Sequence, residues 1–174
     1  MFQKAAKLAS NLRLGMSLDR RGRKAASLNG RGTKRSNQGD FDGALADFCE
    51  AIRLYPDLVA PYVNRSFIWQ ERGEYDKAMA DANRAIDLDP RLAAAYRSRA
   101  EICQLTGKYD RARADCEEVI RLEPASAAGY YARANLHFEL SQLNEAIADY
   151  SAAIERDPRH HDASRCRGMA FQEK

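Results

Sequence analysis

Apolar residues recur at three- and four-residue intervals in short blocks that end at glycine or proline. Residues 60–72 carry apolar side chains at Tyr62, Phe67 and Trp69 and are followed by glycine, which ends a helix by tolerating a left-handed backbone. Residues 76–88 carry alanine and isoleucine at the same spacing and stop before Pro90, which disfavours helix at the residue preceding it. The pattern predicts two short helices joined by a tight turn.

This two-helix pattern recurs every 34 residues along the chain. Small, aromatic, aliphatic and helix-ending residues each occupy fixed columns, and chance does not produce so many coincident columns. The columns are Pro56, Pro90, Pro124 and Pro158; Ala44, Ala78, Ala112 and Ala146; Ile52, Ile86, Ile120 and Ile154; Gly39, Gly73 and Gly107 with Ser141; Phe41, Tyr75, Tyr109 and Leu143; and Gly32, Ser66, Ala100, Ala134 and Gly168.

These columns resemble the signature of the tetratricopeptide repeat family in four consecutive copies over about residues 25–158. The copies cover approximately 25–58, 59–92, 93–126 and 127–160, and residues 161–174 match one further first helix. The resemblance implies an all-α, right-handed superhelical solenoid of stacked helix-turn-helix repeats. It further implies that first helices line a concave face and that residues 161–174 form a C-terminal capping helix.

Two columns of opposite charge run through the predicted helices. Arginine recurs in the first helices and aspartate in the second helices, which invites pairing. We predict pairs between successive copies that give stacking specificity, and we favour this structural role over anion binding because an aspartate at each step would cancel the arginine field. The predicted pairs are Asp47 with Arg65, Asp81 with Arg99, Asp115 with Arg133, and Asp149 with Arg167; Arg31 begins the arginine column.

A second stripe on each first helix faces away from the partner helix and is the candidate binding surface. It contains three aromatic residues that packing within the repeat does not require, and such side chains suit recognition of a helix or extended segment in a groove. The alternative is that these aromatics pack against each other or against the N-terminal arm. The candidate partner-binding residues are Val63, Asn64, Phe67, Gln70, Arg97, Glu101, Tyr131, Asn135 and Phe138.

One subclass of the family clamps acidic C-terminal tails of chaperones with lysine, asparagine and arginine from three first helices. The matching positions here hold Asn29 and Thr33, then Asn64, then Ala94 and Ser98, so only Asn64 fits. Without the cations there is little to hold a terminal carboxylate. The resemblance therefore implies a protein or peptide partner of another kind, whose identity the sequence does not give.

The N-terminal region differs in charge from the remainder of the chain. Residues 1–35 hold ten basic residues and one acidic residue, whereas the other 139 hold 18 basic and 24 acidic residues. We interpret residues 1–24 as a basic arm or capping helix that covers the first repeat. A mitochondrial targeting segment and a binder of anionic membrane or nucleic acid are weaker alternatives. Self-association through this arm or through the C-terminal helix also stays open.

The remaining composition favours a non-catalytic, cytoplasmic protein of 174 residues without cofactor or small-molecule substrate. No stretch approaches the roughly 18 apolar residues of a spanning helix, and the four cysteines form no C-x-x-C pair. No convergent set of nucleophile, base and stabiliser is present. The cluster of His160, His161, Asp162 and Cys166 lacks the spacing of a zinc site, so no metal is expected. We expect His137 to be a packed core residue.

Overall fold

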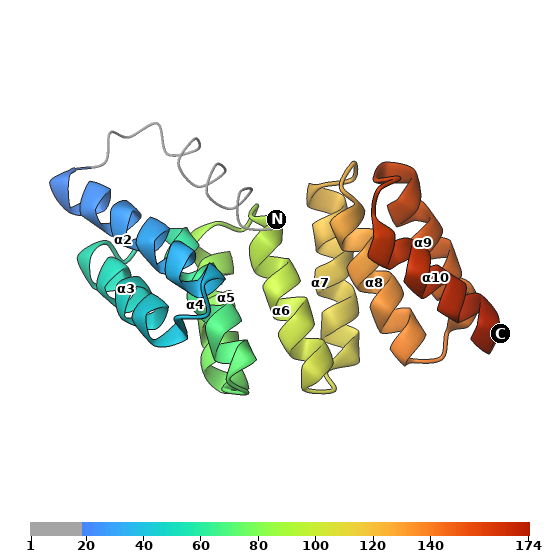
Figure 1. Ribbon diagram of the computed structural model, residues 1–174. Helices are drawn as coiled ribbons and strands as arrows, with labels where there is room; N and C mark the ends of the chain where they lie inside the picture. The colour runs from blue at the N-terminus through green and yellow to red at the C-terminus, as the bar shows by residue number, and fades with distance from the viewer. Residues whose placement is uncertain (1–18) are drawn as a thin grey trace. The chain divides into compact units, whose positions relative to one another are not determined.

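The computed structural model describes residues 19–174, which form α-helices and no strand. Two compact units lie within them, residues 19–98 and 99–174, with the boundary inside one helix. The helices are α2 (Arg20–Asn37), α3 (Phe41–Leu54), α4 (Val59–Glu71), α5 (Tyr75–Leu88), α6 (Ala93–Leu105), α7 (Tyr109–Leu122), α8 (Ala127–Glu139), α9 (Leu143–Arg156) and α10 (His161–Glu173) (Figure 1). The prediction of short helix pairs in an all-α chain is confirmed.

The turn inside each helix pair depends on one residue with a left-handed backbone. Gly39, Gly73 and Gly107 have φ of 81°, 73° and 71°, and Ser141 occupies the same place in the fourth pair with φ of 56°. Glycine adopts this conformation without a steric penalty, whereas serine does not. The glycine column of the sequence is therefore explained by backbone geometry.

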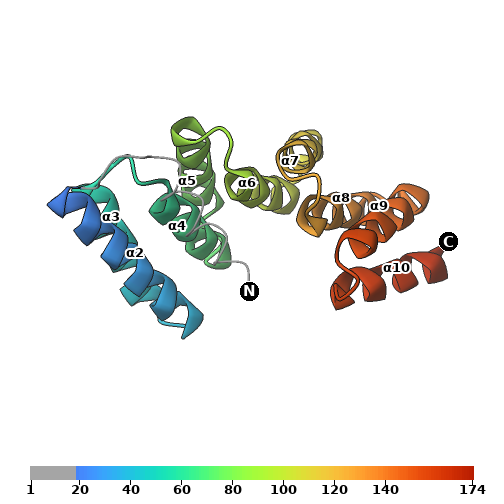
Figure 2. The same cartoon turned by 90° about the horizontal axis from the view of Figure 1, so that it is seen from above.

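In the first unit, α2 packs against α3 and α4 packs against α5, as Figures 1 and 2 show. Ala44, Phe48 and Ile68 form one buried cluster, to which α3 and α4 both contribute. A Cβ atom on Gly32 would lie 2.7 Å from Cε1 of Phe48. The small residue of the first helix is thus required by the large residue of the second helix.

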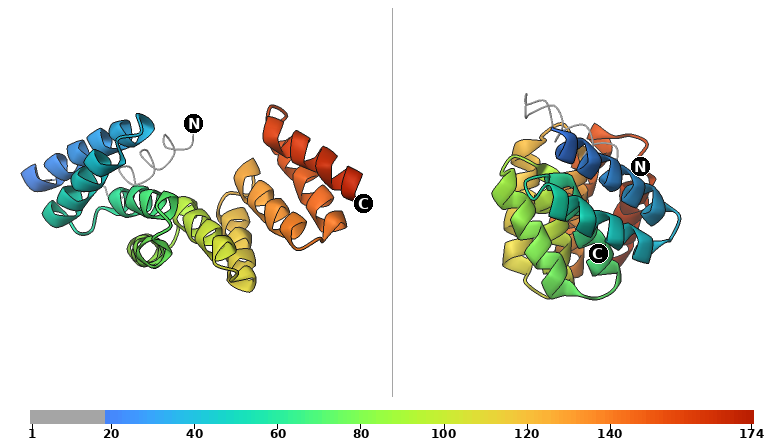
Figure 3. Two further views of the ribbon diagram at one scale, coloured as in Figure 1. Left: turned by 60° about the horizontal axis from the view of Figure 1, so that its bottom comes forward. Right: turned by 90° about the vertical axis from the view of Figure 1, so that its left-hand side faces the viewer.

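In the second unit, α9 lies between α8 and α10 and packs against both (Figures 1 and 3). Ala134 of α8, Tyr150 of α9 and Ala170 of α10 belong to one buried cluster. Alanines at the contacts let the helix axes approach, and Tyr150 fills the space beside them. Helix α10 therefore covers the core that α8 and α9 begin.

The first helix begins earlier than the sequence pattern indicates. Asp19 caps α2 by accepting a hydrogen bond from Gly22 N at 2.7 Å. Residues 20–24, which the sequence interpretation places in the arm, are therefore the first residues of α2; the remainder of the arm, up to residue 18, lies outside the described residues. Within the described part of the chain, every helix is too short or too polar to cross a membrane.

Candidate functional site

The arginine and aspartate columns meet within each repeat. The arginine of the first helix donates hydrogen bonds from both Nε and Nη2 to the aspartate carboxylate of the second helix, which is a bidentate arrangement. The Nε–Oδ2 distances are 2.9 Å for Arg31 with Asp47, 2.8 Å for Arg65 with Asp81, 2.8 Å for Arg99 with Asp115 and 2.7 Å for Arg133 with Asp149.

The prediction that each aspartate pairs with the arginine of the following repeat is wrong. Each carboxylate faces the first helix of its own repeat across the tight hairpin, 16 residues back along the chain. The third nitrogen is what reaches the preceding repeat: Nη1 of Arg65 lies 3.2 Å from Sγ of Cys49, and Nη1 of Arg167 donates to Oγ of Ser151 at 3.2 Å. Arg65 and Arg167 therefore each contact the preceding repeat through Nη1. The partner there is the residue two positions after the aspartate, Cys49 or Ser151, and not the aspartate itself.

Burial makes these pairs structural. The four aspartates are between 3 and 7% exposed. The hydrogen bond from Arg31 holds the pKa of Asp47 below its usual value although burial opposes it, and the bond with Asp81 raises the pKa of Arg65. Asp47 has a second partner, since Nη1 of Arg35 lies 2.9 Å from its Oδ2. Because two nitrogens of each paired guanidinium already bind a carboxylate, the column offers little to an external anion.

The candidate binding stripe of the first unit contains one exposed aromatic side chain. Phe67 of α4 is 40% exposed, whereas Val63 packs against the buried cluster around Tyr62. Gln70, one turn beyond Phe67, has a buried Oε1 without a hydrogen-bond partner among the described residues. In this stripe, Phe67 therefore has apolar surface that nothing covers, and Gln70 has a side-chain oxygen without a hydrogen-bond donor among the described residues.

Polar side chains lie on the same stripe nearer the N-terminus. The amide nitrogen of Asn64 donates to Oδ1 of Asn29 at 2.9 Å and lies 3.2 Å from Oγ1 of Thr33. This network joins α2 to α4. Asn64 is therefore engaged inside the protein and not held ready for a carboxylate. Of the other candidates, Arg97 is half-buried at the end of the first unit and Glu101 is exposed at the start of the second.

The other three candidates of the second unit, Tyr131, Asn135 and Phe138, take part in packing within the unit. Tyr131 contacts the rings of Tyr150 and His160, with centroids 6.0 and 4.6 Å apart. Burial raises the pKa of Tyr131. Asn135 accepts a hydrogen bond from the Tyr150 hydroxyl at 2.9 Å, and Phe138 packs against the cluster of α8, α9 and α10. This arrangement fits the alternative in which the aromatics pack against each other.

His160 has a structural role that the sequence interpretation missed. Its Nδ1 accepts a hydrogen bond from Ala163 N at 3.2 Å and so caps α10, while its ring contacts the Tyr131 ring at an interplanar angle of 40°. His160 stands directly before the first residue of α10, which is the N-cap position. This position in the sequence was the available signal for a capping role. Among the residues that the structure covers, no group of three or more histidine, cysteine or acidic side chains is arranged to hold a metal.

Two of the four cysteines lie in the core, whereas Cys49 is exposed and Cys166 is half-buried. Cys103 and Cys116 are buried free thiols, and burial raises the pKa of both, that of Cys116 to about 12. A thiol that stays protonated is a poor nucleophile. His137 is 14% exposed, and its ring nitrogens lie 2.7 Å from Oε1 of Gln142 and 3.6 Å from Oδ2 of Asp149. Its placement agrees with the expected packed residue.

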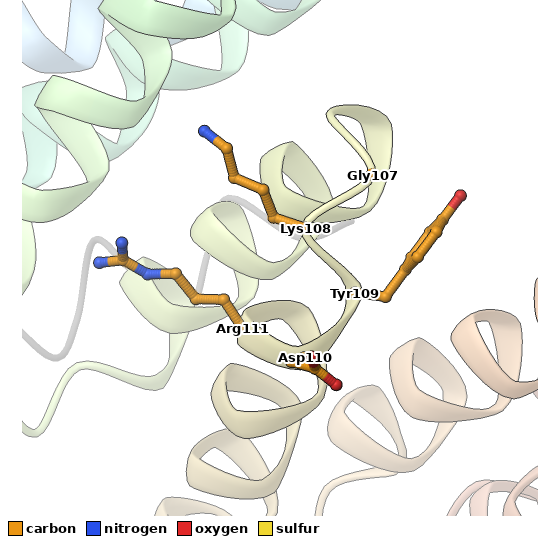
Figure 4. A pocket seen from close by; sticks show the side chains of 5 residues that line it. All are labelled: Gly107, Lys108, Tyr109, Asp110 and Arg111. Carbon is orange, nitrogen blue, oxygen red and sulfur yellow. The ribbon is translucent and has the colours of Figure 1, made fainter.

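A hollow of about 340 Å³ lies at the turn between α6 and α7, lined by residues 107–111. Figure 4 shows Lys108 and Arg111 on one side of the turn and Tyr109 on the other. The Tyr109 hydroxyl donates to Oε1 of Glu139 at 3.0 Å, and this bond raises its pKa. Because five consecutive residues of one turn form the hollow, no convergent set of side chains from several elements defines it as a site.

Comparison with known proteins supports the repeat assignment. Models of the tetratricopeptide repeat family match residues 70–128 and 127–160. No curated protein sequence matches the chain.

Solved structures of similar fold include tetratricopeptide repeat proteins. A thermophilic tetratricopeptide repeat protein from Thermus thermophilus has a TM-score of 0.77 at 23% identity, over 85% of this chain and 81% of that one. MamA from Desulfovibrio magneticus RS-1 has a TM-score of 0.72 at 20% identity, over 87% of this chain and 86% of that one. The first repeat domain of Spaghetti (RPAP3), bound to an HSP90 peptide, has a TM-score of 0.65 at 24% identity, over 73% and 99%.

These likenesses show the fold, and the family matches cover adjoining parts of the chain. The 34-residue columns, the glycine turns and the helix pairs agree with the similar folds and with the family matches. The chain is an all-α solenoid that belongs to the tetratricopeptide repeat family.

Proposed function

We propose that this chain is a non-catalytic adaptor that binds a segment of a partner protein on the first-helix stripe of its repeats, around Phe67 of α4. The exposed part of the Phe67 ring carries the proposal, because covering this apolar surface would gain about 25 cal/mol per Å² before ordering costs. Family membership supports an interaction module in general. A related fold has been solved with a bound peptide.

The surroundings of Phe67 indicate the chemistry of the bound segment. The amide oxygen of Gln70 is buried, and Asn29, Thr33 and Asn64 form a neutral polar network. A segment with one apolar anchor side chain suits this surface, because the anchor would cover the exposed part of the Phe67 ring. An acidic tail does not suit it, since the stripe supplies no cation beside Asn64.

Affinity capture from the source cell with three baits tests the proposal. We expect partners held by the full chain to be lost from Phe67→Ala and kept by Leu105→Ala, which removes another exposed apolar side chain outside the stripe. The affinity of a purified partner segment should fall at least about tenfold with Phe67→Ala. Circular dichroism establishes that all baits are folded. Equal capture by the three baits would contradict the proposal.

One observation favours a second candidate function, binding to an anionic surface. Arg20, Arg21, Arg23 and Lys24 are all exposed at the start of α2, and the first turn of this helix holds no acidic residue. Cations are disfavoured at a helix N-terminus, where the peptide dipoles already place positive charge. A phosphate-bearing partner would relieve that repulsion. The salt dependence argued in the Discussion separates the two functions.

A further inference from the structure

Helix α10 has the sequence of a first helix, and among the described residues it packs on α9, the second helix of the preceding repeat. Ala163, Cys166 and Ala170 pack against the cluster of α8 and α9. The other side of α10 carries Gly168 and Phe171, which are exposed, Phe171 at 59%. This side is the one that faces the second helix in every complete repeat.

The column of Gly168 shows how this side differs from its counterparts. The equivalent residues Gly32, Ser66, Ala100 and Ala134 are buried in all four complete repeats. The space beside Gly32 is filled by the Phe48 ring, whereas a Cβ on Gly168 would meet nothing within 4 Å. The room that a second helix fills elsewhere is thus open on α10.

Arg167 gives the charge of this open side. Its four counterparts each bind a buried aspartate through Nε and Nη2. Arg167 keeps the bond to the preceding repeat, from Nη1 to Ser151, and no carboxylate of the described residues pairs with it. The half-buried guanidinium therefore keeps Nε, Nη2 and a positive charge directed where an aspartate sits in each complete repeat.

We infer that Arg167, Gly168 and Phe171 form a docking site for one helix of a partner protein. That helix presents an aspartate to Arg167 and, at the next residue, an aromatic side chain to Gly168. Charge complementarity defines the aspartate, and Asp47–Phe48 and Asp149–Tyr150 show the required order in complete repeats. Ser164, in the column where Tyr62, Tyr96 and Tyr130 stand, leaves further room for a large ring. This face is separate from the stripe around Phe67.

A helix-stapled, fluorescent peptide with the sequence of α9, residues 143–156, is the probe, and its binding to the full chain is followed by anisotropy. We expect saturable binding that weakens about tenfold when the probe carries Asp149→Asn or the chain carries Arg167→Ala. Combining the two changes should weaken binding little further, because both remove the same pair. Phe171→Ala should also weaken binding.

Two variants of the full chain serve as controls. Arg165→Ala removes an exposed arginine of the same helix that contacts Asp162 and Met169 at the surface, and Phe67→Ala removes the centre of the proposed groove. Both should bind the probe as the unaltered chain does, so this result does not depend on the groove proposal. The substituted side chains are exposed or half-buried, and circular dichroism should show unchanged helicity.

The inference fails if the probe does not bind saturably, or if Arg167→Ala and Asp149→Asn leave its affinity unchanged. It also fails if the site is occupied by a second copy of the chain. Sedimentation velocity tests that occupant: self-association of the full chain that Phe171→Asp abolishes would assign the face to a homodimer. A monomer over the concentrations of the binding assay, together with aspartate-dependent binding, supports the inference.

Discussion

Asp81 and Asp47 occupy the same column but have different surroundings. The side-chain partner of Asp81 in the described residues is Arg65. Asp47 has both Arg31 and Arg35, because Arg35 stands where the second repeat has Trp69. A buried carboxylate without a cation is costly, so the number of arginines decides what loss of one arginine does.

Replacing Arg65 by alanine should therefore destabilise the protein more than replacing Arg31 by alanine. We expect Arg65→Ala to lower the free energy of unfolding by about 2–3 kcal/mol, since it leaves Asp81 buried and unpaired. Arg31→Ala should cost clearly less because Arg35 still neutralises Asp47. Urea unfolding monitored by circular dichroism at neutral pH measures both.

A double-mutant cycle shows whether the Arg65 effect belongs to the pair. Arg65→Ala combined with Asp81→Ala should be less destabilising than the sum of the single changes. Additive effects, or equal losses for Arg65→Ala and Arg31→Ala, would show that side-chain packing and not the buried charge sets the cost.

At the scale of single elements, the turn before α9 is the one that departs from the glycine column. Ser141 adopts φ of 56°, which costs a residue with a Cβ about 1–2 kcal/mol. Ser141→Gly should remove that cost, offset in part by the greater freedom of glycine in the unfolded chain. The expected gain is about 0.5 kcal/mol in free energy of unfolding, seen as a higher Tm in thermal unfolding.

Gly107→Ser is the matched reverse change at the α6–α7 turn. A Cβ there would meet no atom within 4 Å, so the substitution tests backbone conformation without a steric clash. It should destabilise the protein by about as much as Ser141→Gly stabilises it, or somewhat more. A Tm that falls on Ser141→Gly would show that the serine hydroxyl, and not backbone strain, dominates at this turn.

Helix positions were predictable because prolines and glycines mark their ends. The sequence places a helix over residues 60–72 and another over 76–88, and the structure has Val59–Glu71 and Tyr75–Leu88. The start of α2 was missed because Arg20 to Lys24 show no apolar periodicity, and the Asp19 cap alone defines that end. Local sequence therefore predicts elements well where a helix breaker limits them.

Pairing across helices was harder to predict than the helices. Arg31 and Arg65 lie at nearly equal sequence distances from Asp47, so column spacing alone did not show which of them faces the carboxylate. The placement of Tyr131 was missed for a related reason: its ring packs on His160, which is positioned only once α10 docks on α9. Such contacts depend on how each helix is rotated about its axis and how it packs on its neighbour. The spacing of residues in one sequence does not define either.

For the whole molecule, the uneven distribution of charge sets how partner binding should respond to salt. In the first 35 residues basic side chains outnumber acidic ones by ten to one, whereas the other 139 residues have 24 acidic and 18 basic side chains, and the stripe around Phe67 is apolar or neutral. A partner held around Phe67 should lose less than about threefold in affinity between 50 and 200 mM salt. A polyanion held by five or more cations of the N-terminal region should lose about a hundredfold or more over the same range.

Titration calorimetry or anisotropy with a purified partner at several salt concentrations measures this slope. Replacing Arg20, Arg21, Arg23 and Lys24 together by glutamine provides the matched test, because these exposed side chains lie at the start of α2, outside the buried clusters. For an adaptor centred on Phe67, the quadruple variant should keep its affinity and its shallow slope while Phe67→Ala loses affinity. A steep slope that the quadruple variant flattens would assign binding to the N-terminal cations instead, because only contacts that release counterions produce it.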